Sequence, residues 1–179
     1  IGTTPVILKH ENYFLNYYKF KDKVTCLSNQ NLEKLKSVYP NLKTILGDGR
    51  DTGLNENQFD ITISNATLEH VGSFEQQKSF VKEMNRVSKK KSIIITPNRY
   101  YPLDTHTMLP FIHWLPKKIH RKLLKIFKYD FLSLEKNLNL LSTKDLIKIC
   151  SDLNITNYHI QSINFMGFKS NLILIINKI

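Results

Sequence analysis

The sequence has few cysteines, few acidic residues and no long apolar run. Its two cysteines, Cys26 and Cys150, stand far apart within apolar segments, so we expect two buried thiols and no disulfide framework. Two cysteines so far apart also lack the spacing of a metal site. No apolar run approaches the roughly 20 residues that cross a bilayer, and no basic-then-apolar leader is visible. These absences favour a cytoplasmic protein.

The chain has 179 residues, 41% of them hydrophobic and 23% charged. This is enough for one domain with its own core, so we expect a single domain over residues 1–179. Lysine and arginine number 26 against 15 acidic residues, which gives a net charge of +11. Such an excess indicates either an acidic partner or a solvated basic surface, and composition alone leaves both open.

Short apolar runs alternate with amphipathic stretches. The pattern predicts strands at residues 23–27, 43–46, 59–64 and 92–96, and helices at residues 6–18, 31–38, 74–88 and 143–153. Alternation of this kind is typical of an α/β fold with a mostly parallel sheet and helices on both faces. The runs at 155–163 and 171–179, joined by a short connection, predict a C-terminal antiparallel β-hairpin.

Small or polar residues follow two of the predicted strands directly. Gly47, Asp48 and Gly49 come after the run at 43–46, and Asn65 and Ala66 come after the run at 59–64. Ligands of parallel sheets lie beyond the carboxyl ends of the strands. A carboxylate beside glycines at such an end can meet a ligand with its side chain and with bare backbone. The stretch therefore predicts a nucleotide-like ligand.

The order of four motifs resembles one enzyme family. The chain reads GDGRD, then FDITISNATLEHV, then KEMNRV, then SIIITPN. This series is similar to the methyltransferase type 11 group of the class I S-adenosylmethionine-dependent methyltransferases, over residues 1 to about 142. The resemblance implies a Rossmann-like sheet, S-adenosylmethionine as cofactor, and methyl transfer as the reaction.

The resemblance also implies cofactor contacts. Asp48 matches the acid that accepts a hydrogen bond from the adenine amino group, and Gly49 follows it with a free backbone N–H. Gly2 resembles the last glycine of the family's first motif. The segment that lines the methionine part is matched by Ser64, Asn65 and Ala66.

Two features depart from the family. The place of the acidic residue that holds the ribose reads Ser28-Asn29-Gln30, and we expect Ser28 and Asn29 to bind the ribose as neutral groups. The first strand and most of the first motif are absent from the chain. Without that strand two neighbouring strands would expose their backbone edges, so we expect an N-terminally truncated fragment whose first strand is missing.

Three residues are candidates for proton transfer at the acceptor. His70 follows the cofactor-contacting segment, and Asp104 and His106 lie in the loop soon after the predicted strand at 92–96. A base is needed when the acceptor is a hydroxyl, which favours O-methylation. The alternative is a structural role for these residues in packing, helix capping or the loop.

Regular spacing of His106, His113 and His120 could suggest a metal site. Pro110 and Pro116 interrupt any single helix through them, so these histidines need not share a face. We therefore expect no metal.

Residues 100–139 depart from the alternation, and we expect them to form a lid-like insertion. Residues 116–129 carry apolar side chains on one helical face with lysines around it, as in an interfacial membrane helix. The alternative is a helix that packs its apolar face on the domain. The membrane hypothesis implies a lipid-linked rather than a small soluble acceptor, with residues 111–129 on an anionic surface and the protein peripheral at the membrane.

The sequence also bears on two other functions: methylation of a nucleic acid and non-catalytic binding. Enzymes that methylate base amino groups carry an Asn/Asp-Pro-Pro-aromatic motif where this chain reads Ser64-Asn65-Ala66-Thr67, so we do not expect a nucleic-acid partner. A non-catalytic methyltransferase-like module that binds a membrane surface or a protein partner is the second hypothesis. The neutral residues 28–30 favour it modestly.

Overall fold

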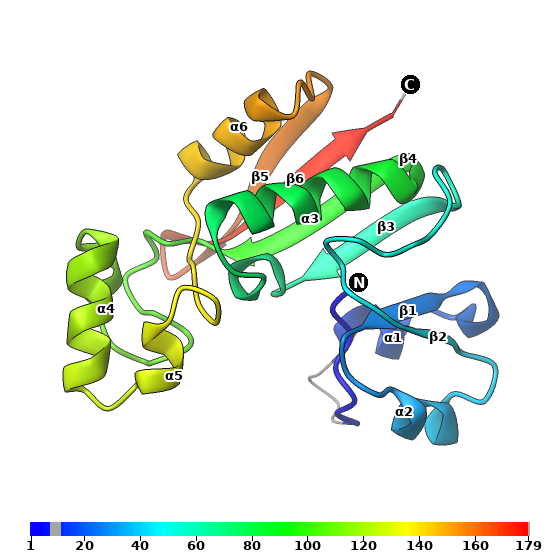
Figure 1. The fold of residues 1–179 in the computed structure, drawn as a ribbon, viewed down its shortest axis with the longest axis horizontal. Coiled ribbons are helices and arrows are strands. Elements are labelled where there is room, and N and C mark those ends of the chain that lie inside the picture. Colours follow the sequence, from blue (N-terminus) through cyan, green and yellow to red (C-terminus); the bar gives the residue numbers. More distant parts are fainter. Residues whose placement is uncertain (8–11, 179) are drawn as a thin grey trace.

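The computed structural model describes residues 1–7 and 12–178, which form two sheets (Figure 1). The smaller sheet pairs β1 (Thr25–Ser28) with β2 (Lys43–Leu46) in parallel. The larger sheet has the order β3-β4-β6-β5, with β3 (Phe59–Asn65) parallel to β4 (Ser88–Pro97). Helices and strands alternate along the chain, so the predicted α/β class is confirmed.

The larger sheet is mixed and not mostly parallel. β6 (Phe168–Asn177) runs antiparallel to β4 and to β5 (Tyr158–Phe165). The predicted C-terminal hairpin is therefore confirmed. The prediction of a mostly parallel sheet is wrong for this sheet, because the hairpin supplies two of its four strands.

One face of the larger sheet carries the main core. Helices α3 (Phe74–Val87) and α6 (Thr143–Asp152) pack there. The fully buried side chains of this core include Phe80, Val81, Met84, Ile94, Leu146, Ile149, Leu172 and Leu174. β4 lies inside the sheet, but Ile93 and Ile95 on its other face are only half-buried. Helices on both faces of this sheet are thus not observed among the described residues.

Helices α3 and α6 each begin at a serine that caps them. Ser73 and Ser142 each form a capping box, in which the serine and the third helical residue hydrogen-bond each other's backbone N–H groups. Because each cap fixes where its helix starts, it also fixes which side chains meet the sheet.

A second, smaller core lies under β1. Helices α1 (Tyr13–Tyr17) and α2 (Glu33–Val38) contribute Leu15 and Leu35, which pack with Cys26. The helix predicted at residues 6–18 is therefore shorter, and part of that prediction, residues 8–11, falls outside the described residues. Two 3-10 turns complete the first part of the chain: η1 (Lys21–Lys23) precedes β1, and η2 (Leu68–His70) follows β3 and contributes Leu68 to the main core.

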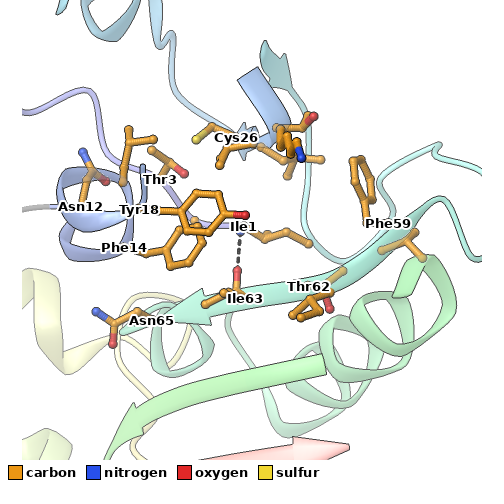
Figure 2. A pocket seen from close by; sticks show the side chains of 18 of the residues that line it. Ile1, Thr3, Asn12, Phe14, Tyr18, Cys26, Phe59, Thr62, Ile63 and Asn65 are labelled. Atoms are coloured by element: carbon orange, nitrogen blue, oxygen red, sulfur yellow. Dashed lines mark hydrogen bonds between the residues drawn. The ribbon is translucent and has the colours of Figure 1, made fainter. Parts of the chain in front are cut away.

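A groove of about 230 Å³ separates the two sheets, lined by Phe14, Tyr18, Phe59 and Ile63 among others (Figure 2). Ile1 and Gly2 bridge it. The Ile1 amino group donates to Ile63 O at 2.7 Å, and Gly2 N donates to Leu27 O at 2.9 Å. No strand within residues 1–7 and 12–178 pairs with the facing edges of β1 and β3. The two sheets are therefore separate within the part of the chain that the structure describes.

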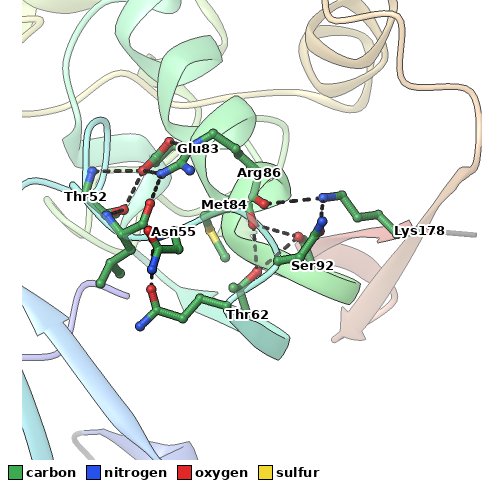
Figure 3. Close-up of polar contacts among 11 residues, drawn as sticks. Thr52, Asn55, Thr62, Glu83, Met84, Arg86, Ser92 and Lys178 are labelled. Carbon is green, nitrogen blue, oxygen red and sulfur yellow. Dashed lines mark hydrogen bonds and ion pairs between the residues drawn. The ribbon is translucent and has the colours of Figure 1, made fainter.

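Polar contacts tie α3 to the strands below it (Figure 3). Thr62 Oγ1 of β3 and Ser92 Oγ of β4 lie 3.0 Å apart, and both donate to Met84 O. Nearby, Glu83 accepts hydrogen bonds from Arg86 and from Thr52 N. These bonds fix the connector that leads from β2 to β3.

Residues 98–141, here called the lid segment, lie beside the larger sheet and away from the smaller one (Figure 1). They contain η3 (Ile112–Trp114), α4 (Lys117–Ile126) and α5 (Asp130–Ser133). The two ends of the segment meet, because Arg99 N donates to Leu141 O at 2.9 Å beside a bridge between Asn98 and Leu141. None of the helices described is long and apolar enough to span a membrane.

Candidate functional site

A cleft of about 690 Å³ opens at the carboxyl ends of β1, β2 and β3. This volume is within the range of small-molecule sites. Seven of the residues singled out in the sequence line the cleft: Gly2, Ser28, Asn29, Asp48, Gly49, Ala66 and His70. The carboxyl ends of β1, β2 and β3 therefore meet at one place, which is where ligands of parallel α/β sheets lie.

Two glycines allow the backbone to form the wall of this cleft. Gly2 has a φ of +81°, and a Cβ there would lie 2.1 Å from Thr67 Oγ1. A Cβ on Gly49 would lie 2.5 Å from the ring of Phe80. Neither position has room for a side chain without a shift of its neighbours, so both present bare backbone to the cleft.

Asp48 is held in place by Arg50. The Arg50 Nε atom lies 2.9 and 3.0 Å from the two carboxylate oxygens of Asp48. This hydrogen bond from the guanidinium holds the pKa of the Asp48 carboxyl below its usual range. The side chain is 46% exposed, so the carboxylate remains open to a ligand. The Arg50 contact could not be read from the sequence, because it depends on the turn that follows β2.

The residues after β1 offer neutral groups. Ser28 Oγ accepts a hydrogen bond from Gln30 N at 3.1 Å, which keeps this hydroxyl at the strand end, and Asn29 is exposed on the same wall. A hydroxyl and an amide can both donate and accept hydrogen bonds, so they suit a polyhydroxylated group.

The last two residues of β3, Ser64 and Asn65, and the following Ala66 lie in three different environments. Ala66 lines the cleft with a φ of +49°, and its N–H donates to Ile95 O at 2.9 Å. Ser64 is buried beneath it, and Asn65 lines the groove between the sheets (Figure 2). The structure thus brings Ala66 to the cleft but not the side chains of Ser64 and Asn65, because adjacent residues of a strand point to opposite faces.

His70 and His106 meet at the rim of the cleft, and their Nε2 atoms lie 3.2 Å apart. The Nδ1 atom of His70 lies 2.7 Å from Asn137 O, and that of His106 lies 3.0 Å from Asp104 Oδ1. Burial lowers the pKa of His106, but the hydrogen bond and charge of Asp104 outweigh it, so the pKa lies above its usual value. The three candidates for proton transfer therefore form one cluster.

Glu69, the neighbour of His70, completes this cluster. Its carboxylate is fully buried, and Oε2 accepts a hydrogen bond from Thr96 Oγ1 at 2.9 Å. Burial raises the pKa of the Glu69 carboxyl above its usual value. The sequence placed Glu69 beside His70 but could not show that it turns inward.

The other two histidines of the regularly spaced set lie elsewhere. His113 and His120 pack against each other with ring centroids 6.4 Å apart, and His113 Nε2 bonds to Tyr101 O at 2.6 Å. His106 pairs with His70 instead, so the even spacing of the three in the sequence does not correspond to a common site.

The comparisons with known proteins agree with this geometry. Residues 13–96 match the family model described as "Methyltransferase domain", of type 11. Within residues 13–96 the chain therefore carries a methyltransferase type 11 domain, as the motifs predict. S-adenosylmethionine is the cofactor of this family. A search of curated proteins finds no match.

Solved structures share the fold of this methyltransferase domain at low sequence identity. A protein from Pyrococcus horikoshii has a TM-score of 0.58 at 15% identity, with 92% of this chain and 74% of that chain covered. An S-adenosylmethionine-dependent methyltransferase from Methanosarcina mazei has 0.57 at 14% identity, with 87% and 81% covered. The 1,6-didemethyltoxoflavin-N1-methyltransferase of Burkholderia thailandensis, solved with S-adenosylhomocysteine, has 0.58 at 10% identity, with 93% and 64% covered.

Proposed function

We propose that this methyltransferase domain transfers the methyl group of S-adenosylmethionine to an oxygen atom of a small or lipid-linked acceptor. The bound cofactor supplies a methyl carbon activated by a sulfonium, so the protein mainly has to orient the acceptor and accept its proton. The observation that carries the proposal is that the cleft at the strand ends opens directly onto the pair His70 and His106.

On the cofactor side, Asp48 would accept a hydrogen bond from the adenine amino group, and Gly49 would offer its N–H. Gly2 would let the backbone approach the methionine part, and Ser28 and Asn29 would hydrogen-bond the ribose. All five line the cleft. Ser64 and Asn65 would support Ala66 from within the strand.

On the acceptor side, a hydroxyl is a poor nucleophile and requires a proton acceptor. Asp104 orients His106 through its Nδ1 atom, and Asn137 O does the same for His70. Both imidazoles therefore direct Nε2 towards the same point at the rim of the cleft. An amine acceptor would have less need of such a pair.

The lid segment would close over the acceptor. Phe131, Lys136 and Asn137 of this segment already line the cleft, so acceptor contacts come from the lid while cofactor contacts come from the strand ends. We propose the insertion of residues 100–139 as the part that determines which acceptor is used.

The cofactor assignment is tested by calorimetric titration of S-adenosylhomocysteine. Asp48→Ala should weaken binding about tenfold or more, because a charged hydrogen bond contributes roughly 1.5–3 kcal/mol. Asp60→Ala is the matched control. Asp60 is an exposed carboxylate near the start of β3, away from the cleft, and it pairs with Lys90 of β4. Equal affinity in wild type and Asp48→Ala would refute the assignment.

The lipid-linked acceptor is favoured by the outer face of the lid segment. Ile119, Ile126 and Phe127 of the α4 region are 47%, 72% and 49% exposed, with lysines between them. The helix buries His120 and Leu124 instead. An exposed apolar face ringed by lysines is typical of a helix that lies on an anionic membrane.

Co-sedimentation with vesicles of phosphatidylglycerol and phosphatidylcholine tests the membrane contact. The double variant Ile126→Ser, Phe127→Ser should lose most of the bound fraction. Phe165→Ser is the control, because Phe165 is 60% exposed at the tip of the β5–β6 hairpin. If the bound fraction depends neither on the anionic lipid nor on the double variant, the acceptor would be a small soluble molecule.

A further inference from the structure

Three side chains at the rim of the cleft have the arrangement of a metal site. Glu69 Oε1 lies 3.8 Å from His70 Nε2 and 3.9 Å from His106 Nε2, and the two nitrogens are 3.2 Å apart. We propose that Glu69, His70 and His106 bind one divalent transition-metal ion, which holds and activates the acceptor oxygen. With the ion bound, the Nε2 lone pairs of both histidines are coordinated, so the ion replaces the imidazoles as the group that activates the acceptor hydroxyl. That role rests on the proposed function, whereas the binding of the ion does not.

The separations match metal–ligand bond lengths. A point about 2.1 Å from each of the three atoms lies between them, and Zn²⁺ binds imidazole nitrogens and carboxylate oxygens at roughly 2.0–2.2 Å. No side chain has to change its rotamer to bring the three ligand atoms into range.

Hydrogen bonds behind the ligands fix them in the form that binds a metal. Asn137 O can only accept, so the Nδ1 atom of His70 carries the hydrogen and Nε2 keeps its lone pair. Asp104 Oδ1 accepts from His106 in the same way. A carboxylate or carbonyl behind each histidine is the usual outer shell of a metal site. Thr96 likewise donates to Glu69 Oε2 and leaves Oε1 directed at the imidazoles.

Glu69 Oε1 and the Nε2 atoms of His70 and His106 need a positively charged partner. Glu69 Oε1 is fully buried and accepts no hydrogen bond from the residues that the structure describes. A buried polar atom in that state is costly, and two imidazole lone pairs that face each other repel. A proton shared by the two Nε2 atoms would satisfy the nitrogens but not Glu69 Oε1. A cation among the three atoms satisfies them all.

The ligand set indicates the kind of ion. Two imidazoles with one carboxylate suit Zn²⁺, Fe²⁺, Co²⁺ or Mn²⁺ better than Mg²⁺ or Ca²⁺, which prefer oxygen ligands. His70 lines the cleft and its side chain is 38% exposed, so the open coordination positions would face the cleft. An acceptor hydroxyl bound there would release its proton to solvent near neutral pH, because a bound cation lowers the pKa of an oxygen ligand.

The test begins with the purified protein after dialysis against a chelator, titrated with Zn²⁺ by calorimetry and with Co²⁺ by visible absorption. We expect one ion per chain and Co²⁺ bands typical of nitrogen and oxygen ligands. His70→Gln and His106→Gln should each weaken binding at least tenfold. Asp104→Asn should weaken it by roughly 10- to 100-fold through the outer shell.

His159→Gln is the matched control, since His159 is exposed on β5, far from the cleft. Folding of every variant is checked by circular dichroism, and His70→Gln is the decisive variant because its side chain is partly exposed. A folded wild type that binds no Zn²⁺, or binds it as well after His70→Gln, would overturn the metal site. Zn²⁺ binding without binding of S-adenosylhomocysteine would leave the metal site standing and refute the proposed function.

Discussion

The core over the larger sheet and the lid segment differ in the share of polar side chains that they bury. Between α3, α6 and the sheet, the body of the protein has an apolar core, with residues such as Phe80, Met84 and Leu174. The lid segment buries Leu124, Leu138, Leu140 and Leu141 together with a larger set of polar side chains, among them Asp104, Thr107, His113, His120 and Ser133. Its exposed side chains include Met108, Phe111, Trp114, Ile126 and Phe131. Apolar burial thus stabilises the body, whereas hydrogen bonds shape the lid and leave its apolar surface for a partner or substrate.

The two regions should differ most in how much folding stability is lost when one aromatic side chain is removed. Phe80→Ala should lower the free energy of unfolding by about 3–5 kcal/mol, since the ring of this α3 residue is fully buried and packs against Gly49. Phe131→Ala, in the exposed part of the lid, should change it by less than about 0.5 kcal/mol. Urea unfolding measures both. Similar losses in the two variants would show that the lid is packed like the body.

Mild acid should affect the lid before the body. Burial lowers the pKa of His120 from its ordinary 6.5 to about 4. Between these values the unfolded chain binds a proton that the folded chain does not, so this contribution is complete above pH 6.5 and is lost as the pH falls to about 4. We expect a loss of about 2 kcal/mol over that interval.

The charged and titratable groups that act on His120 are Asp104, His113, Arg99 and Arg121. In urea unfolding at pH 7 and pH 4.5, His120→Gln should remove the loss. His159→Gln, on the exposed β5, should retain it. A wild type and a His120→Gln variant with the same pH dependence would contradict the assignment.

The ion pair of the body should resist acid much further. Hydrogen bonds from Arg86 lower the pKa of Glu83 from its ordinary 4.5 to about 2. This stabilisation is therefore present above pH 4.5 and is lost as the pH falls through about 2. Glu83→Gln should cost about 1–2 kcal/mol at pH 7, and the difference should vanish near pH 2. Glu75→Gln, on the exposed side of the same helix, should have little effect at either pH.

Local sequence predicted the elements that local chemistry determines. Residues 43–46 form β2 as expected, and Ser73 and Ser142 start their helices because a capping box needs only four neighbouring residues. The start of β4 was missed, since Ser88 to Lys91 are too polar to be read as a strand and extend only because β3 pairs with them from Phe59 onwards. Pairing across the chain was not visible in the sequence.

The same limit applies to the site. His70, Asp104 and His106 were identified as residue types, and the structure brings them together. The burial of Glu69 could not be foreseen, because it depends on Thr96 and on Asn139, whose N–H donates to Glu69 O at 2.8 Å. The expectation of no metal was based on His106, His113 and His120, which Pro110 and Pro116 keep off a common helix. The cluster instead pairs His106 with His70, which precedes β4 in the sequence.

The meeting of Asn98 and Leu141 has a consequence for how such enzymes diversify. The lid segment leaves and re-enters the body at neighbouring positions, so a replacement of different length closes the same short gap and adds little loop entropy. The strand-end cleft would be untouched by the exchange. Under the proposed role of the lid, transplanting residues 98–141 into a relative should carry the choice of acceptor with it, so that this segment would act as a unit of recombination.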